Sequence, residues 1–165
     1  MASRNLSAIG ESAKRLTIYA IKSTGDTAQA LVQATTDLLV VVAEGVTQVT
    51  LTVEKGVVQI VKEAISGTAD MGGDVFLTTK SAVRGAIKGA AEVGADVGKV
   101  AVTATEEAIK AAGEVGADTS KATQAAVTGA IEAANEIGGG AAKTVRDALV
   151  ASVKGAKDVI KEIKH

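Results

Sequence analysis

The chain contains no cysteine and no proline, and only Tyr19 and Phe76 among its 165 residues are aromatic. The absence of cysteine excludes disulfides, thiol catalysis and cysteine metal sites. The absence of proline means that no residue forces a helix to stop. Because large side chains are scarce, the 47% of hydrophobic residues are mostly alanine and valine, which bury little area each. We therefore expect a shallow core.

Features of catalysis and of nucleic-acid binding are also missing. The net charge is −1 and the charges are balanced along the chain, which does not favour a nucleic-acid partner. The single histidine, His165, is the last residue and is expected to be a plain tail. The tract Gly138-Gly139-Gly140 lacks the Lys-Ser/Thr pair that follows in a phosphate-binding loop. We expect no catalytic residue, no metal ligand, no cofactor and no small-molecule substrate.

No long apolar run indicates export or membrane insertion. Residues 1–21 contain no uninterrupted apolar stretch, so no signal peptide is expected. The most apolar run, residues 38–43, is much too short to span a bilayer. The sequence thus favours a cytoplasmic protein.

The chain is instead organised by an internal repeat of 22 residues. Residues 88–109, 110–131 and 132–153 align without gaps, and the register extends more weakly back to residue 22. One column of the repeat is apolar and includes Ile65, Ile87, Ile109 and Ile131. Another is glycine: Gly72, Gly94, Gly116 and Gly138. Twenty-two residues make six turns of about 3.67 residues, close to the α-helical 3.6, so the period predicts helices.

Each unit is amphipathic. Apolar and small residues occupy positions 3, 6, 10, 14, 17 and 21 of the unit, and polar residues occupy positions 1, 5, 9, 12, 16 and 20. On a helix these two sets lie largely on opposite faces. We expect an all-α array that is more than about 60% helical, with the apolar set facing inward. In one unit the inward set includes Val93, Val97, Ala104 and Ala108.

Three segments are distinguished: an N-terminal amphipathic segment at 1–43, a Val/Thr-rich unit at 44–65, and the regular repeat at 66–165. Alternating Val and Thr make residues 44–62 compatible with a β-hairpin, but the repeat register favours a helix there. Glycine clusters at 71–74 and 137–140 are expected to break the helices. The fold class is therefore an array of long helices, or of helical hairpins packed as a bundle.

Glycines within the helices indicate close helix packing. An interior glycine costs about 1 kcal/mol of helix stability relative to alanine, so a compensating contact is expected. The residues expected to mediate packing are Gly85, Gly89, Gly94, Gly98, Gly116, Ile65, Ile87, Ile109, Ile131, Val93, Val115 and Ile137. On this interpretation, leucine at Gly94 or Gly116 disrupts assembly, whereas alanine there raises helicity and perturbs contacts little. The alternative is a weak helix that bends at glycine.

The segments Glu44-Gly45-Val46 and Lys55-Gly56-Val57-Val58 resemble the synucleins. Group-3 late-embryogenesis proteins and the exchangeable apolipoproteins have similar amphipathic repeats, of 11 and 22 residues as in this chain. The resemblance covers the period and composition of most of the chain, but the synuclein Lys-Thr-Lys-Glu-Gly-Val motif and the proline punctuation of apolipoproteins are absent. What it implies is an amphipathic helix that can lie on a lipid surface.

Two functions are compatible with these features. The first is a structural protein that self-associates as a bundle or filament, and the second is a peripheral coat on a membrane or lipid droplet. Lipid-binding helices place lysine at the edge of the apolar face, whereas the lysine columns here lie near the centre of the polar face. The apolar face is also shallow and lacks Trp, Phe and Leu anchors. We therefore favour self-association into a multimer, with the lipid coat as the alternative.

Overall fold

The computed structural model describes residues 11–19, 27–45 and 53–163. After a helical segment at 11–19, the helices are α2 (Thr27–Gly45), α3 (Val53–Asp70), α4 (Val75–Glu92), α5 (Val97–Glu114), α6 (Thr119–Ile137), α7 (Ala141–Ser152) and α8 (Ala156–Ile163). Helices thus make up more than the fraction of about 60% that the sequence predicted, and no strand occurs in these ranges. Residues 53–62 are helical, which contradicts the hairpin alternative there, while 46–52 lie outside the described residues.

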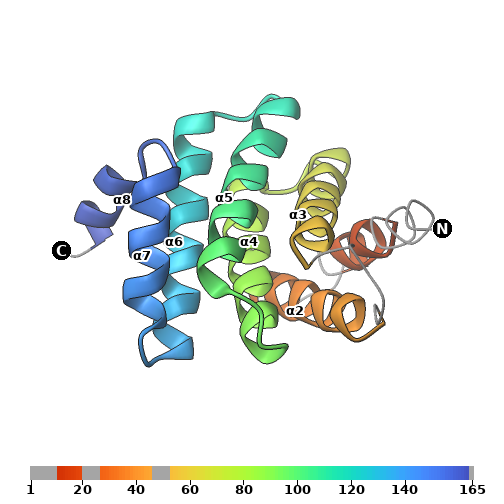
Figure 1. Cartoon of the computed structure of the whole chain (residues 1–165). Helices are drawn as coiled ribbons and strands as arrows, with labels where there is room; N and C mark the ends of the chain where they lie inside the picture. The colour runs from red at the N-terminus through yellow and green to blue at the C-terminus, as the bar shows by residue number, and fades with distance from the viewer. Residues whose placement is uncertain (1–10, 20–26, 46–52, 164–165) are drawn as a thin grey trace.

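The helices are arranged in two layers (Figure 1). One layer contains α2, α4, α6 and α8, and each of these helices packs against the next one in the layer. The other layer contains α3, α5 and α7, packed in the same way. From α2 to α8, helices that follow one another in the chain also contact each other, across the two layers. A 22-residue unit is therefore one helix with its turn, and two units make one step along the array.

A glycine and an aspartate build the turns between the helices. After α4, Gly94 has a φ of 73°, and the Ala95 N–H donates to the Ala90 carbonyl at 2.8 Å, which satisfies the helix C-terminus. Asp96 Oδ1 then accepts a hydrogen bond from the Lys99 N–H at 3.1 Å and caps α5. The same arrangement recurs at 72–74 before α4 and at 116–118 before α6. The glycine column of the repeat therefore ends helices.

The breaks at 71–74 and 137–140 are confirmed, but the chain also turns at 93–96 and 115–118, where the sequence predicted continuous helix. The physical reason lies in the length of the turn. Four residues replace about one helical turn, so the apolar rhythm continues on the far side without a change of phase. A break of this kind leaves the periodicity of the sequence unchanged.

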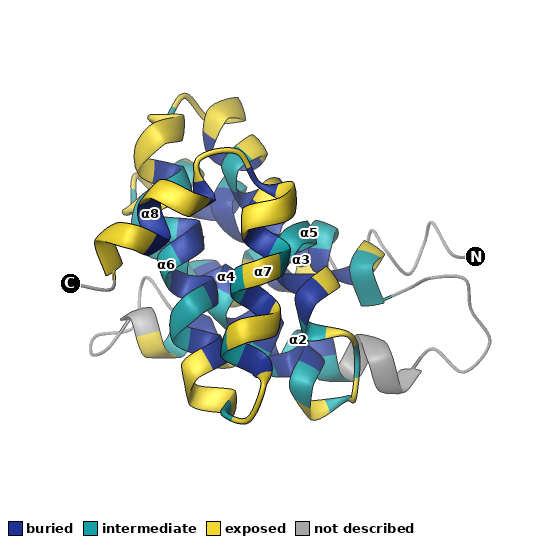
Figure 2. Cartoon of the chain, turned by 60° about the vertical axis from the view of Figure 1, so that its left-hand side comes forward, coloured by how far each residue is buried: buried dark blue, intermediate teal, exposed yellow. Residues whose placement is uncertain are grey.

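The core is built from small side chains at the interface of the two layers. Its largest fully buried members are leucine and isoleucine residues such as Ile60, Ile87 and Leu149, surrounded by many alanines and valines. Figure 2 shows the buried residues on the inner sides of the helices and exposed residues on the outer sides of α7 and α8. Of the residues expected to face inward, Ala104 and Ala108 are fully buried. Val97 is half-buried and packs against the core.

Candidate functional site

Two glycines bring the helices of the α2–α4–α6 layer into backbone contact. A Cβ atom on Gly85 of α4 would lie 2.6 Å from the Val32 carbonyl oxygen of α2. A Cβ on Gly129 of α6 would lie 2.3 Å from the Lys80 carbonyl oxygen of α4. Thr36 Oγ1 also donates to the Gly85 carbonyl at 3.0 Å, which joins α2 to α4. Close approach at Gly85 agrees with the sequence interpretation.

Gly129 was not singled out from the sequence. It lies 44 positions after Gly85, which is two 22-residue units, and the intervening unit has Glu107 at the same place. The signal in the sequence was this alternation of glycine and glutamate, which repeats after two units. It distinguishes helices of one layer from helices of the other.

Most of the remaining predicted packing residues also lie against neighbouring helices. A Cβ on Gly89 would lie 3.0 Å from Leu39 Cδ2, and one on Gly98 would lie 3.2 Å from Thr144 Cγ2. Ile65 and Ile87 are 0% exposed. Two further isoleucines of that column are partly buried and pack against the core: Ile109 and Ile131.

The other predicted packing residues lie at helix ends, and the role given to Gly94 and Gly116 is wrong. Both glycines have a positive φ, of 73° and 85°, and a Cβ on either would point into open space. Val93 and Val115 are the C-cap residues of α4 and α5. Val115 and Ile137, the last residue of α6, are each 37% exposed. Gly94 and Gly116 therefore set where the chain turns, whereas Ile137 lies in a hollow beside Lys88 and Ala91 of α4.

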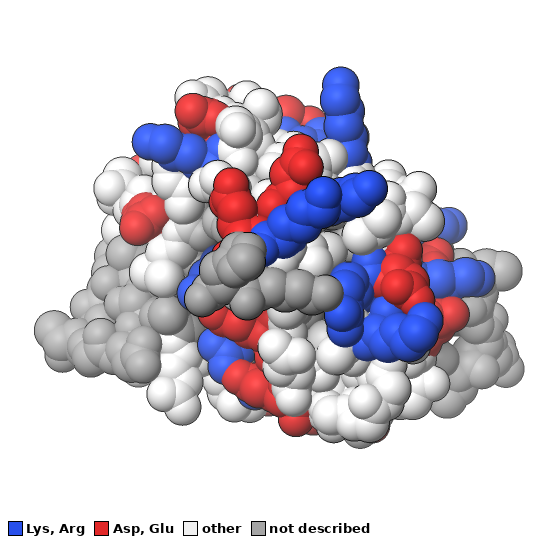
Figure 3. Space-filling model, turned by 90° about the vertical axis from the view of Figure 1, so that its left-hand side faces the viewer, with Lys and Arg blue, Asp and Glu red and all other residues white. Residues whose placement is uncertain are grey.

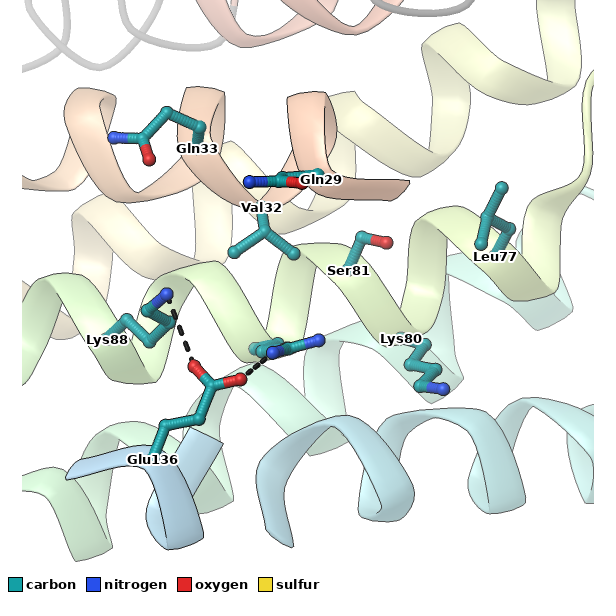
Figure 4. Close-up of a pocket in the computed structure, with 9 residues that line it drawn as sticks. Gln29, Val32, Gln33, Leu77, Lys80, Ser81, Lys88 and Glu136 are labelled. Atoms are coloured by element: carbon teal, nitrogen blue, oxygen red, sulfur yellow. Dashed lines mark ion pairs between the residues drawn. The ribbon is translucent and has the colours of Figure 1, made fainter. Parts of the chain in front are cut away.

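A surface groove runs along α4 between α2 and α6 (Figure 4). Its cavity volume is about 350 Å³. The lining residues come from α2 (Gln29, Val32 and Gln33), from α4 (Leu77, Lys80, Ser81, Arg84 and Lys88) and from α6 (Glu136). The close α2–α4 and α4–α6 crossings therefore place an amide-bearing helix and an acidic helix on either side of a basic row.

The groove contains a network of ion pairs between α4 and α6. Lys80 Nζ lies 3.1 Å from Glu132 Oε1, and Lys88 Nζ lies 3.2 Å from Glu136 Oε2. Arg84 bridges the two carboxylates, with Nη1 at 3.6 Å from Glu132 Oε2 and Nη2 in direct contact with Glu136 Oε1. All five side chains are between 31% and 39% exposed, so the pairs contribute modestly to stability but define the charge of the groove.

The repeat pattern of the sequence does not indicate this network. Glu136 occupies position 5 of its unit, which the repeat assigns only to the polar face of the helix. In the folded chain, Glu132 instead approaches the residues of a helix two units earlier. The residues themselves carried a signal, since three bases and two acids are each spaced four apart: Lys80, Arg84 and Lys88, and Glu132 and Glu136.

One carboxyl group is buried in the other layer. Glu107 of α5 is 9% exposed, whereas its neighbour Glu106 is exposed. Burial raises the pKa of Glu107 above its ordinary value, and Lys110 offsets part of that effect. The folded chain therefore holds the proton of Glu107 more tightly than the unfolded chain does.

Because the pKa of Glu107 is higher in the folded state, ionisation destabilises the fold. The parent should lose stability as the pH rises from the ordinary value of 4.5 through the raised value. We expect Glu107→Gln to be more stable than the parent at about pH 7, and the difference to shrink below about pH 4. Urea unfolding across this range measures it. Glu106→Gln is the control and should show no such pH-dependent gain; a matching profile for both variants would contradict the prediction.

The fold and the groove define a two-layer helical repeat array with a charged surface groove. Among the described residues, no group of three or more His, Asp or Glu could hold a metal ion. None of the described helices combines the length and the apolar character needed to cross a membrane. No protein-family model matches the chain, and comparisons with curated proteins and with solved structures give no significant match.

Proposed function

We propose that the chain is a non-catalytic helical repeat scaffold that acts through protein–protein contacts and self-associates. One observation carries the proposal, an open hollow on the face formed by α6, α7 and α8. The hollow has a volume of about 230 Å³ and is lined by Ile131, Asn135, Ala142, Arg146, Ile160 and Ile163. Ile163 is 38% exposed there, and α8, with eight residues, is shorter than the other helices of its layer.

The repeat explains why a second copy fits this face. Each helix of the array packs against the helix two units away, so similar complementary surfaces recur along the chain. When such a surface is left uncovered, another copy can dock on it in a heterologous contact, which closes into a ring or continues as a filament. The cytoplasmic location expected from the sequence is part of this proposal.

The arrangement of apolar and charged residues supports a protein scaffold over a lipid coat. A lipid-bound helix needs its apolar face free, whereas here alanines such as Ala104 and Ala108 are buried inside the array. Basic and acidic side chains are intermixed on the face drawn in Figure 3. A mixed surface of this kind attracts anionic lipid weakly.

Sedimentation at micromolar concentration tests self-association. We expect the parent to sediment as an oligomer and Ile163→Glu, which places a charge in the hollow, to shift it towards the monomer. Ala151→Glu adds the same charge at an exposed residue of α7 outside the hollow, and should sediment like the parent. A compact monomer of 16.4 kDa at every concentration would contradict the proposal. A helical signal that requires added vesicles would support the lipid coat.

A further inference from the structure

The groove between α2 and α6 contains a row of basic side chains on α4 with different borders on its two sides. Its basic row, Lys80, Arg84 and Lys88, covers residues 80–88 of α4, and its ends are about 12 Å apart at 1.5 Å per residue. Glutamates border the row on the α6 side. On the α2 side it is bordered by Gln29 and Gln33, which carry no charge.

The donors of the basic row exceed the acceptors that α6 supplies. Three cations face two carboxylates, which leaves one positive charge in excess. Each lysine makes one ion pair to a glutamate in the network, although an ammonium group has three N–H donors. The Nε–H of Arg84 is buried and has no hydrogen-bond acceptor. The two lysine ammonium groups, which are partly exposed, can therefore donate to further carboxylates beside the row.

The α6 helix shows which geometry the row accepts. Glu132 and Glu136 are four residues apart, so their carboxylates are about one helical turn apart and meet successive cations of α4. A point anion such as phosphate can reach only part of a row of this length. A chain with several carboxylates at similar spacing can follow the whole of it, while its apolar atoms contact Val32 and Leu77.

We propose that this groove binds an acidic peptide segment of a partner protein, with carboxylates about one helical turn apart. The inference rests on the proposed function, because it gives the scaffold a partner other than its own copies. The bound carboxylates share the basic row with Glu132 and Glu136 and approach from the α2 side. The two glutamates compete with the bound carboxylates for the basic row and so limit the affinity of the peptide. A change of charge at either glutamate therefore changes that affinity.

Fluorescence anisotropy with the full chain tests the groove. The probe is a labelled alanine-rich helical peptide with glutamates four residues apart, and its matched control has glutamines at the same positions. We expect the glutamate peptide to bind about tenfold more tightly than the glutamine peptide, a difference that weakens as salt rises from about 50 to about 300 mM. The double variant Lys80→Gln/Lys88→Gln should lose most of this preference.

Two variants make the test specific. Glu136→Gln removes a competing carboxylate, so it should tighten binding of the glutamate peptide several-fold. Lys143→Gln removes one positive charge on α7, outside the groove, and should bind like the parent. Circular dichroism of each variant is the control that checks whether it is folded. Equal affinity for the two peptides, no effect of the double lysine variant, weaker binding after Glu136→Gln, or full competition by inorganic phosphate at equal charge would each overturn the proposal.

The same variants separate this proposal from the scaffold function. The Lys80→Gln/Lys88→Gln protein should still sediment as an oligomer, because the hollow beside Ile163 lies on the α6–α8 face and not in the groove. Loss of peptide binding with self-association intact supports the groove assignment. Absence of peptide binding in an oligomeric parent rejects the groove proposal alone.

Discussion

Gly129→Ala is expected to lower the free energy of unfolding by about 3 kcal/mol, because an added Cβ at this position overpacks a backbone crossing. The new Cβ would lie 2.3 Å from the Lys80 carbonyl oxygen and 3.2 Å from its Cα. Neither is the end of a flexible side chain, so α6 must move away from α4. In a chain of this size the loss corresponds to a fall in melting temperature of about 6–12 °C. Thermal unfolding followed by circular dichroism measures it.

The matched control for this change is on the same helix. Thr128 is half-buried, and Thr128→Ala removes a β-branched residue without adding atoms at the α4–α6 crossing. It should change the unfolding free energy by less than about 1 kcal/mol. If Gly129→Ala is as stable as the parent, then α4 and α6 do not cross at this residue. The groove geometry would lose its basis in that case.

Gly94→Ala is expected to destabilise the protein by about 1–2 kcal/mol, the opposite of what helix propensity predicts. The φ of 73° at Gly94 is a left-handed conformation that alanine adopts at a cost. No lost contact is involved, since a Cβ there would meet open space. Gly116→Ala, with a φ of 85°, should behave in the same way. Chemical denaturation measures both losses.

Gly113→Ala is the comparison that isolates backbone conformation. Gly113 lies within α5 and has an ordinary helical φ, and its added Cβ would meet the exposed Thr119 methyl at 3.2 Å. We expect a change within about 0.5 kcal/mol, because the gain in helix propensity offsets the small adjustment of Thr119. If Gly94→Ala changes the stability no more than Gly113→Ala does, the turn at 93–96 is wrong and the continuous helix that the sequence pattern predicted is correct.

Part of this structure could be predicted from the composition and the spacing of residues alone. The scarcity of aromatic residues and the 11-residue rhythm predict amphipathic helices with a core of alanine and valine, and the described residues confirm both. The repeat also predicted burial at Ile65 and Ile87 and close packing at Gly85. These features follow from one helix at a time, because the spacing of residues along a helix determines which of them share a face.

The sequence pattern could not by itself distinguish a turn from a helix of the same phase. Gly94 and Asp96 form a glycine C-cap followed by an aspartate N-cap, a pair that typically marks a helix end and a helix start. The apolar rhythm passed through this pair unchanged, so periodicity favoured the wrong alternative. Weighing cap residues against periodicity would have predicted the turns.

What the sequence by itself determined is the helical state, the repeat length and the inward face of most units, all of which depend on residues within a few turns of one another. Only the tertiary structure decided that helices two units apart become neighbours in one layer. That step brings Arg84 to Glu132 and Glu136, residues about two units away, and it creates the groove. Contacts at such separation depend on where each turn redirects the chain and on how closely Gly85 and Gly129 allow the backbones to approach.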